Sequence, residues 1–266
     1  MNMIWSIPHD IRWSSIDDAD KPWDRRVPYY ERFRDHFADM IKAGTLSPGS
    51  RLPPERALAE DFSITRITVR QALMRMEAEG LIFREDRRGW FISPPRVRYD
   101  PTANIGFTES VTEQGREPGT TVMSKQKIAA TQWESDNLGC AIGDPIFVVN
   151  RTRTVDQRAV MVEQILVKAG RCPDLLDHAL DQSMTALMAE KFGIIEHRAK
   201  INMRPAALSG VPAKALGVAE GTPSLYLSRT ILDQYNEVVE LDQEFWRHDA
   251  IDIWVSAAAS LNKRQE

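Results

Sequence analysis

Cysteine is scarce in this chain, since only Cys140 and Cys172 occur, far apart and in no CxxC pair or Cys/His array. That pattern argues against a zinc site and suits the reducing cytoplasm. Long apolar runs are also missing, because none approaches the roughly 20 residues that cross a bilayer. The N-terminal stretch MNMIWSIPHDIRWSSIDDAD carries acids and tryptophans instead of the basic and then apolar segments of a secretory signal. We therefore expect a cytoplasmic protein with no metal, cofactor or membrane span.

An excess of positive charge is lacking as well. The formal net charge is −4 at pH 7, so binding to a nucleic acid would require a local positive surface rather than a basic whole. The 266 residues, 42% of them hydrophobic, are enough for two domains with sizeable cores. Periodicity and composition predict an N-terminal tail (1–26), a first domain (27–93), a Pro-rich linker (94–104), a second domain (105–257) and a C-terminal tail (258–266).

Three helices followed by two short strands are predicted in the first domain. Aromatic and apolar residues recur at helical spacing after Pro28, and a second, shorter helix opens at Pro54. The segments LIFRE and GWFI are typical of two strands joined by a tight Arg-Gly turn. This order of elements is that of a winged helix-turn-helix. The third helix has a predicted buried stripe of Val69, Ala72, Leu73 and Met76.

The third helix and the turn between the strands carry residues suited to DNA. The first turns of such a helix face base edges in the major groove, where Arg pairs with guanine and Thr holds phosphates. A tip of Arg87, Arg88 and Gly89 suits the adjacent backbone or minor groove. The alternative is a solvated arginine face on a small structural domain. The candidates on the helix are Thr65, Arg66, Thr68 and Arg70.

The second domain alternates strand-like and helical segments. Helices are expected at 133–138, 183–192 and 212–217. Strands are expected in TTVMSKQKIAA, PIFVVNRTRTV, AVMVEQILVKA, AKINMRPAA, PSLYLSRTIL and EVVELDQEFW. We therefore expect an α+β domain built around an antiparallel sheet.

Charged residues on these strands form a candidate anion site. Arg151 and Arg153 are two apart, so they share one strand face and suit a phosphate-like group, unless that face is solvated. Ser183 opens a predicted helix whose free amides favour an anion, although it is equally an ordinary N-cap. Glu163 lies in an apolar strand, where a buried carboxylate needs a cationic partner or a ligand ammonium; an exposed edge position is the alternative.

The segment LPPERALAEDFSITRITVRQALMRMEAEGLIFREDRRGWFI resembles the DNA-binding domain of GntR-family transcription regulators, with its pattern LPSER, a Gly turn, SRxTVRxAL and a wing ending in Gly. Three residues depart from that pattern: Pro54 replaces Ser, Ser63 replaces the turn Gly and Arg87 replaces a wing Gly. A left-handed Ser63 would cost about 1 kcal/mol. The resemblance implies operator contacts by Glu55, Arg56, Thr65, Arg66, Thr68, Arg70, Arg88 and Gly89.

Residues 105–255 resemble the UTRA effector-binding domain of the HutC branch of that family, which has a chorismate-lyase-like fold. The matching segments are GFTESV, NRTR with its paired arginines, the acidic VE position and the Ser-led QSMTALM. In ELDQEFWRHD, Glu240 and Trp246 belong either to the pocket or to the core or rim. The resemblance implies that Glu163 and Glu240 hold a polar or cationic end of the ligand. An anionic head would be held by Phe107, Thr108, Arg151, Arg153 and Ser183.

The segments DRRGWF, DPTANIGF, EQGREP and EFWRHD further resemble regulators of phosphonate utilisation, especially of 2-aminoethylphosphonate. Two arginines, a helix N-terminus and two carboxylates complement a phosphonate that carries an ammonium. The resemblance thus implies a transcription factor that responds to a small anionic effector and binds a palindromic operator as a homodimer.

Three alternatives to this function stay open. Sensors of sugar phosphates or histidine-type catabolites with the same fold carry similar residues. An enzyme similar to chorismate lyase belongs to another class, but the sequence offers no recognisable nucleophile–base pair, metal spacing or phosphate-binding Gly loop. A DNA-binding architectural protein with an inert second domain is the third alternative.

Overall fold

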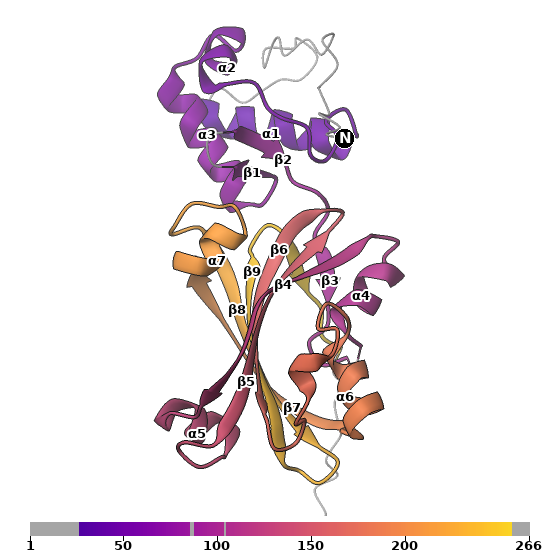
Figure 1. The fold of residues 1–266 in the computed structure, drawn as a ribbon. Helices are drawn as coiled ribbons and strands as arrows, with labels where there is room; N and C mark the ends of the chain where they lie inside the picture. Colours follow the sequence, from indigo (N-terminus) through magenta and orange to yellow (C-terminus); the bar gives the residue numbers. More distant parts are fainter. Residues whose placement is uncertain (1–26, 86–87, 104, 257–266) are drawn as a thin grey trace, which may run out of the picture.

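The computed structural model describes residues 27–85, 88–103 and 105–256, which form two domains (Figure 1). The first domain has the predicted order of three helices and a two-stranded antiparallel ribbon, which is a winged helix-turn-helix. Its elements are α1 (Tyr29–Lys42), α2 (Glu55–Asp61), α3 (Arg66–Ala78), β1 (Ile82–Glu85) and β2 (Gly89–Ile92).

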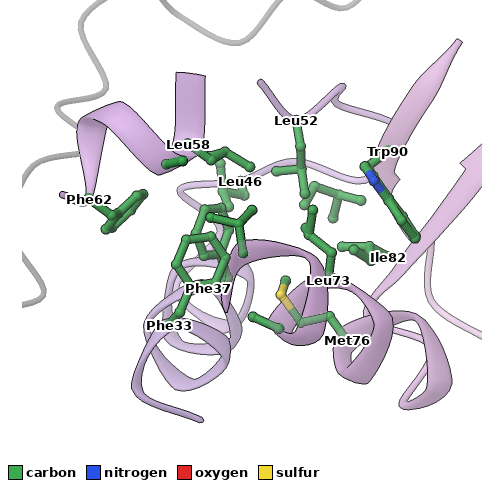
Figure 2. Close-up of a cluster of buried hydrophobic side chains, with 14 residues drawn as sticks. Phe33, Phe37, Leu46, Leu52, Leu58, Phe62, Leu73, Met76, Ile82 and Trp90 are labelled. Atoms are coloured by element: carbon green, nitrogen blue, oxygen red, sulfur yellow. The ribbon is translucent and has the colours of Figure 1, made fainter. Parts of the chain in front are cut away.

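The core of the first domain lies between its helices and the ribbon. The predicted stripe on α3 is confirmed, since Val69, Ala72, Leu73 and Met76 are fully buried. Phe33 and Phe37 of α1 have ring centroids 4.6 Å apart, and Phe62 lies 4.9 Å from Phe33 (Figure 2). Because α3 packs on this aromatic cluster with one face, its opposite face is free for contact with another molecule.

The turn between α2 and α3 contains one strained residue. Ser63 has φ of 52°, in the left-handed region where a glycine would be unstrained. The expected cost of about 1 kcal/mol for a side chain in this conformation therefore applies. Phe62, immediately before it, is buried in the core of the domain.

The second domain is built on one antiparallel sheet of six strands in the order β4-β5-β6-β9-β8-β7. This confirms the predicted α+β class. The strands are β4 (Pro118–Ala129), β5 (Pro145–Val155), β6 (Arg158–Lys168), β7 (Glu196–Ala207), β8 (Pro223–Asp233) and β9 (Val238–Arg247).

Helices cover both faces of this sheet. On one face, α4 (Phe107–Glu113) and α6 (Met184–Phe192) each pack into a separate apolar cluster. A short 3-10 helix, Leu175–Asp177, packs in the same cluster as α6. On the other face lie α5 (Gln132–Leu138) and α7 (Gly210–Ala215). Figure 1 shows α4 and α6 on the same side of the sheet. The gap between their two apolar clusters leaves space for a polar site.

The segment expected as an irregular linker, 94–104, instead contains strand β3 (Val97–Tyr99). This strand pairs in parallel with β10 (Ile251–Ile253). Tyr99 is thereby brought into the second domain, with its ring centroid 5.2 Å from that of Trp246. The connection is therefore anchored by the end of the second domain. Helix α4 was not predicted either.

An aromatic residue of the wing joins the two domains. The Phe83 ring on β1 has the guanidinium of Arg158 4.0 Å from its centroid and that of Arg247 at 5.0 Å. Both arginines form ion pairs with Asp249, which is 1% exposed. Because Asp249 fixes both guanidinium groups, Phe83 is held in a clamp of defined geometry. We call Phe83, Arg158, Arg247 and Asp249 the Phe83 clamp.

A second contact between the domains lies beside the Phe83 clamp. The His248 Nε2 atom is 2.9 Å from the backbone oxygen of Glu77 on α3. An open cleft of about 1320 Å³ separates the wing and the Pro94 region from α7 nearby. The contact between the domains is therefore localised around Phe83 and His248.

Candidate nucleic-acid interface and ligand pocket

The N-terminus of α3 is capped by Thr65. The Thr65 hydroxyl accepts a hydrogen bond from the Thr68 amide at 3.1 Å, and the two hydroxyl oxygens are 2.9 Å apart. Arg66 follows with an exposed side chain. The cap thus fixes the start of the helix while leaving Arg66 free to contact another molecule.

Helix α2 is linked to α3 by an ion pair. The Arg70 Nη2 atom lies 2.9 Å from the Glu55 carboxylate, and Arg56 lies 3.8 Å from Glu60. These groups are largely solvated, so the pairs contribute little to stability. In this structure Glu55 orients Arg70.

The wing is described only in part. Arg88 donates a hydrogen bond to Glu85, and its guanidinium lies 5.4 Å from the Phe91 ring centroid. Gly89 has φ of 104°, a conformation that favours glycine, at the start of β2. Arg87, the third expected contact of the tip, lies outside the described residues.

One exposed residue of α3 was missed by the sequence reasoning. Ile67 is 74% exposed between Arg66 and Thr68, an unusual place for a large aliphatic side chain. The signal was present in the sequence, because Ile67 falls off the buried stripe of Val69. An apolar residue that the core does not use is one that a partner molecule can contact.

In the second domain, a cavity of about 40 Å³ lies on the α4 and α6 face of the sheet. All the residues expected to bind an effector surround it, although they come from five different elements. These residues are Phe107, Thr108, Arg151, Arg153, Glu163, Ser183, Glu240 and Trp246.

Two arginines and one carboxylate form the anion end of this cavity. Arg151 and Arg153 of β5 both donate through Nε to the same Glu163 oxygen, which lies 2.8 Å from Arg153. Arg151, Arg153 and Glu163 are 2%, 4% and 4% exposed. A solvated sheet face for the arginines is therefore excluded, and so is an exposed edge position for Glu163. Glu163 has the cationic partners that its burial requires.

The electrostatics of this triad follow from its burial. Burial alone raises the pKa of Glu163, but the charges of Arg153 and Arg151 and their hydrogen bonds outweigh it, so the pKa is lowered. Burial lowers the pKa of Arg153 despite the opposing charge of Glu163. The triad therefore carries two positive charges against one negative charge.

The remaining nitrogens of the two arginines differ in their bonding. Arg151 Nη1 donates to the backbone oxygens of Leu180 and Gln182 at 3.0 and 2.9 Å, and Arg153 Nη1 donates to Thr120 at 2.6 Å. Neither Nη2 atom forms a hydrogen bond within the described part of the chain, although both residues line the cavity. Two guanidinium donors therefore remain available there.

The first residues of α4 and α6 meet above the cavity. Ser183 caps α6 by accepting a hydrogen bond from the Ala186 amide at 3.3 Å, as an ordinary N-cap does. A Cβ atom on Gly106, which precedes α4, would lie 3.3 Å from the Ser183 hydroxyl. Phe107 packs beside Trp246, with ring centroids 6.0 Å apart. The two helix starts therefore form one wall of the cavity.

The opposite end of the cavity is acidic. Glu240, Asp242 and Glu244 share one face of β9 at alternate positions and line the cavity with Arg229 of β8. Arg229 lies 3.6 Å from Glu244 and also donates to the Tyr99 hydroxyl. Sequence reasoning found Glu240 but missed Asp242, Glu244 and Arg229, although the alternation in VELDQEFW was visible.

Burial acts strongly on the carboxylates of β9. It raises the pKa of Asp242 to about 6 and that of Glu244 to about 7, and it raises the pKa of Glu240 well above its ordinary value. The Trp246 indole donates to Glu244 at 2.6 Å, which offsets only part of the effect. The cavity therefore has a cationic end on β5 and an acidic end on β9.

A winged helix-turn-helix joined to an α+β domain with a polar cavity defines a DNA-binding regulator of the two-domain type. Residues 29–92 match the family model for bacterial regulatory proteins of the gntR family, and residues 113–252 match the UTRA domain. The chain belongs to the GntR family of transcription regulators and carries a UTRA domain. Members of this family bind operator DNA and typically dimerise.

Known relatives agree with this assignment. The HTH-type transcriptional repressor NagR of Bacillus subtilis is 30% identical over 84% of this chain and 92% of its own. The uncharacterised regulator YihL of Escherichia coli K12 is 27% identical over 85% of this chain and 96% of its own. The crystal structure of PhnF from Mycobacterium smegmatis has a TM-score of 0.62 at 26% identity, covering 85% of this chain and 99% of that one.

Two further observations concern the described part of the chain. No helix there is long and apolar enough to span a membrane. No group of three or more His, Cys, Asp or Glu side chains in that part has the arrangement of a metal site. The domains and relatives indicate a transcription regulator rather than an enzyme.

Proposed function

We propose that this regulator senses a small anionic metabolite, with 2-aminoethylphosphonate or a related phosphonate or catabolite as the best candidate, to control catabolic or transport genes. The observation that supports it is the pair of free Nη2 donors on Arg151 and Arg153 in a buried cavity. Guanidinium groups bind phosphate-like oxygens through charge-assisted hydrogen bonds, which are the stronger kind. Sugar phosphates offer a similar head and form the alternative class.

The size of the cavity implies that binding is coupled to motion. A volume of about 40 Å³ holds about three water molecules, which is less than a phosphonate with an ethyl chain occupies. The starts of α4 and α6, which meet at Gly106 and Ser183, therefore separate when the ligand enters. A ligand that binds only the opened arrangement shifts the protein toward it, and this is how the effector changes affinity for DNA.

Thermal unfolding with a ligand panel tests the sensor function. A ligand at about 100 times its Kd stabilises the native state by about 2.7 kcal/mol. The panel contains 2-aminoethylphosphonate, glucosamine 6-phosphate, histidine catabolites and inorganic phosphate. Arg153→Lys keeps a positive charge but lacks the Nη2 donor, so this variant is expected to lose the ligand-induced rise in melting temperature. Arg204→Lys, on the exposed part of β7, is expected to keep it. An equal shift in both variants contradicts the anion site.

We further propose that the protein binds a palindromic operator as a homodimer, with α3 in the major groove of each half-site. Arg66 and Arg70 contact bases or phosphates, Arg56, Thr65 and Thr68 hold phosphates, and the wing residues Arg87, Arg88 and Gly89 reach the flanking backbone. Glu55 acts through its ion pair with Arg70.

Ile67 adds an apolar contact to this proposal, because the methyl group of thymine is the natural partner of an exposed aliphatic side chain in the major groove. An operator selected by the protein from random duplexes, and then remade with uracil for each thymine in turn, tests it. Wild-type protein loses affinity at one thymine per half-site, and Ile67→Ala does not. Met74→Ala is the matched control, since Met74 is 58% exposed on the same helix. Equal uracil effects in wild type and Ile67→Ala contradict the contact.

A further inference from the structure

Two buried polar atoms at the acidic end of the cavity lack hydrogen-bond partners within the described residues. They are Oδ1 of Asp242 and Nε of Arg229. The two residues are direct cross-strand partners on β9 and β8, and both line the cavity. Buried polar atoms in native proteins are nearly always satisfied, by protein, water or ligand. Asp242 therefore brings an unmatched acceptor to the wall of the cavity, where a bound molecule can donate a hydrogen bond to its carboxylate.

The ion pairs are unevenly distributed among the carboxylates of the cavity. Arg151 and Arg153 both pair with Glu163, and Arg229 pairs with Glu244. Within the described residues, neither Glu240 nor Asp242 has a cationic group at ion-pair distance, although they are 3% and 9% exposed. Burial is the first cause of their raised pKa values, and the charges of Arg151 and, for Asp242, Arg229 offset only part of it. The two carboxyl groups also share a hydrogen bond, which contributes to the raised pKa of Glu240. At this end of the cavity three carboxyl groups, those of Glu240, Asp242 and Glu244, therefore line the wall beside a single arginine, Arg229.

We propose that Asp242, together with Glu240, is the cation subsite of the effector pocket, and that the effector carries an ammonium group at the end opposite its anionic head. This assignment rests on the proposed sensor function and makes it more specific. It also replaces the expected role of Glu163, whose carboxylate already accepts from two arginines. An ammonium has three donors, enough for Asp242 Oδ1 and Glu240 at once.

The strand order sets the distance between the two ends. Arg151 pairs with Glu163 and Glu163 with Glu244, so Asp242 is two strands away from Arg151 and two residues along β9. With strands about 4.8 Å apart and about 3.4 Å per residue, the two Cα atoms are roughly 12 Å apart. The Arg151 guanidinium is bonded to Glu163 on β6, the strand that lies between β5 and β9. The remaining gap fits an anion and an ammonium separated by a short chain, not a large or polymeric ligand.

A series of ligands with one head tests the subsite. 2-Aminoethylphosphonate, 2-hydroxyethylphosphonate and ethylphosphonate share the phosphonate and differ only at the other end. Wild-type protein is expected to bind the amine about tenfold or more tightly than the other two by calorimetry, as one charge-assisted hydrogen bond provides. Asp242→Asn keeps the shape and removes one of the two carboxylates, so its preference for the amine is much smaller than that of wild type. Gln243→Asn, the neighbouring position on the opposite strand face, retains the preference.

Several outcomes distinguish the subsite from the sensor function itself. A wild-type protein that binds all three phosphonates equally, or an Asp242→Asn protein that prefers the amine as strongly as wild type does, overturns the cation subsite and leaves the anion site standing. Absence of binding by every phosphonate counts against the proposed ligand class. In that case ethylammonium chloride, compared with sodium chloride at equal ionic strength, still tests the subsite. It is expected to stabilise wild-type protein more than Asp242→Asn, and an equal effect on both refutes the assignment.

Discussion

Replacement of Glu163 by glutamine is the sharpest test of how the anion end of the pocket works. The carboxylate is 4% exposed and is the counter-charge of both Arg151 and Arg153. Removing one partner of a buried ion pair costs about 3–5 kcal/mol because a charge is left unpaired. A domain protein has about 5–15 kcal/mol of stability in total. The E163Q protein is therefore expected to fold with a much reduced free energy of unfolding.

The same substitution is expected to tighten anion binding. A unit negative charge about 6 Å from the ligand, at an effective dielectric constant near 20, repels an anion by roughly 3 kcal/mol. Glutamine removes that repulsion and leaves Arg151 and Arg153 without the carboxylate that forms ion pairs with both. Ligand should therefore restore much of the stability that E163Q loses, so that the two proteins differ far less when saturated.

Urea unfolding followed by circular dichroism, with and without 2-aminoethylphosphonate or inorganic phosphate, measures both effects. The m-value should not change, because the surface exposed on unfolding is the same. Gln164→Ala, which removes the neighbouring side chain that bonds to Asn150, is the control. A loss below about 1 kcal/mol, or a smaller ligand-induced stabilisation in E163Q than in wild type, would refute the reasoning, because a buried pair must cost more than an exposed one.

Three further predictions address other parts of the molecule. Burial raises the pKa of Glu244 from 4.5 to about 7, so the folded state binds more protons than the unfolded state between these values and loses stability as pH rises through them. Urea titrations should show this fall, up to about 3 kcal/mol in wild type and less in Glu244→Gln, and parallel curves contradict it. Arg66→Ala is expected to weaken operator binding by roughly 1–3 kcal/mol and to relax base preference; equal losses on random DNA identify a phosphate contact instead. Phe83→Leu should leave operator affinity without ligand nearly unchanged and reduce the ligand effect, measured by fluorescence anisotropy; an intact ligand effect excludes the Phe83 clamp from coupling.

The first domain was predictable because its signals are local. Helical spacing after Pro28, the apolar stripe around Leu73 and the glycine of the wing each determine structure within a few residues. Strands β3 and β10 were not predictable, because a three-residue parallel pair has no period of its own and depends on a partner far along the chain. Helix α4 is similarly short, and Gly106 gave no side-chain cap to mark its start.

The sequence predicted several of the residues that line the pocket but not which of them form ion pairs with one another. The shared face of Arg151 and Arg153 follows from the two-residue period of a strand. The partner of Glu163 depends on which strands are neighbours, and the order β5-β6-β9-β8 cannot be deduced from local patterns. Asp242 was overlooked for the same reason, since its significance comes from lying opposite Arg229 without bonding to it.

The Phe83 clamp has a consequence for recombination between members of this family. DNA-reading and sensing domains are attractive modules to exchange, in natural gene fusion or in the construction of biosensors. Here Phe83 belongs to the DNA-binding domain, and Arg158, Arg247 and Asp249 belong to the effector domain. If the clamp couples the two domains, a hybrid whose DNA-binding domain has no aromatic residue at this position is expected to bind both operator and ligand but to lose the ligand effect on DNA binding. The aromatic residue and its two arginines would then have to be exchanged together.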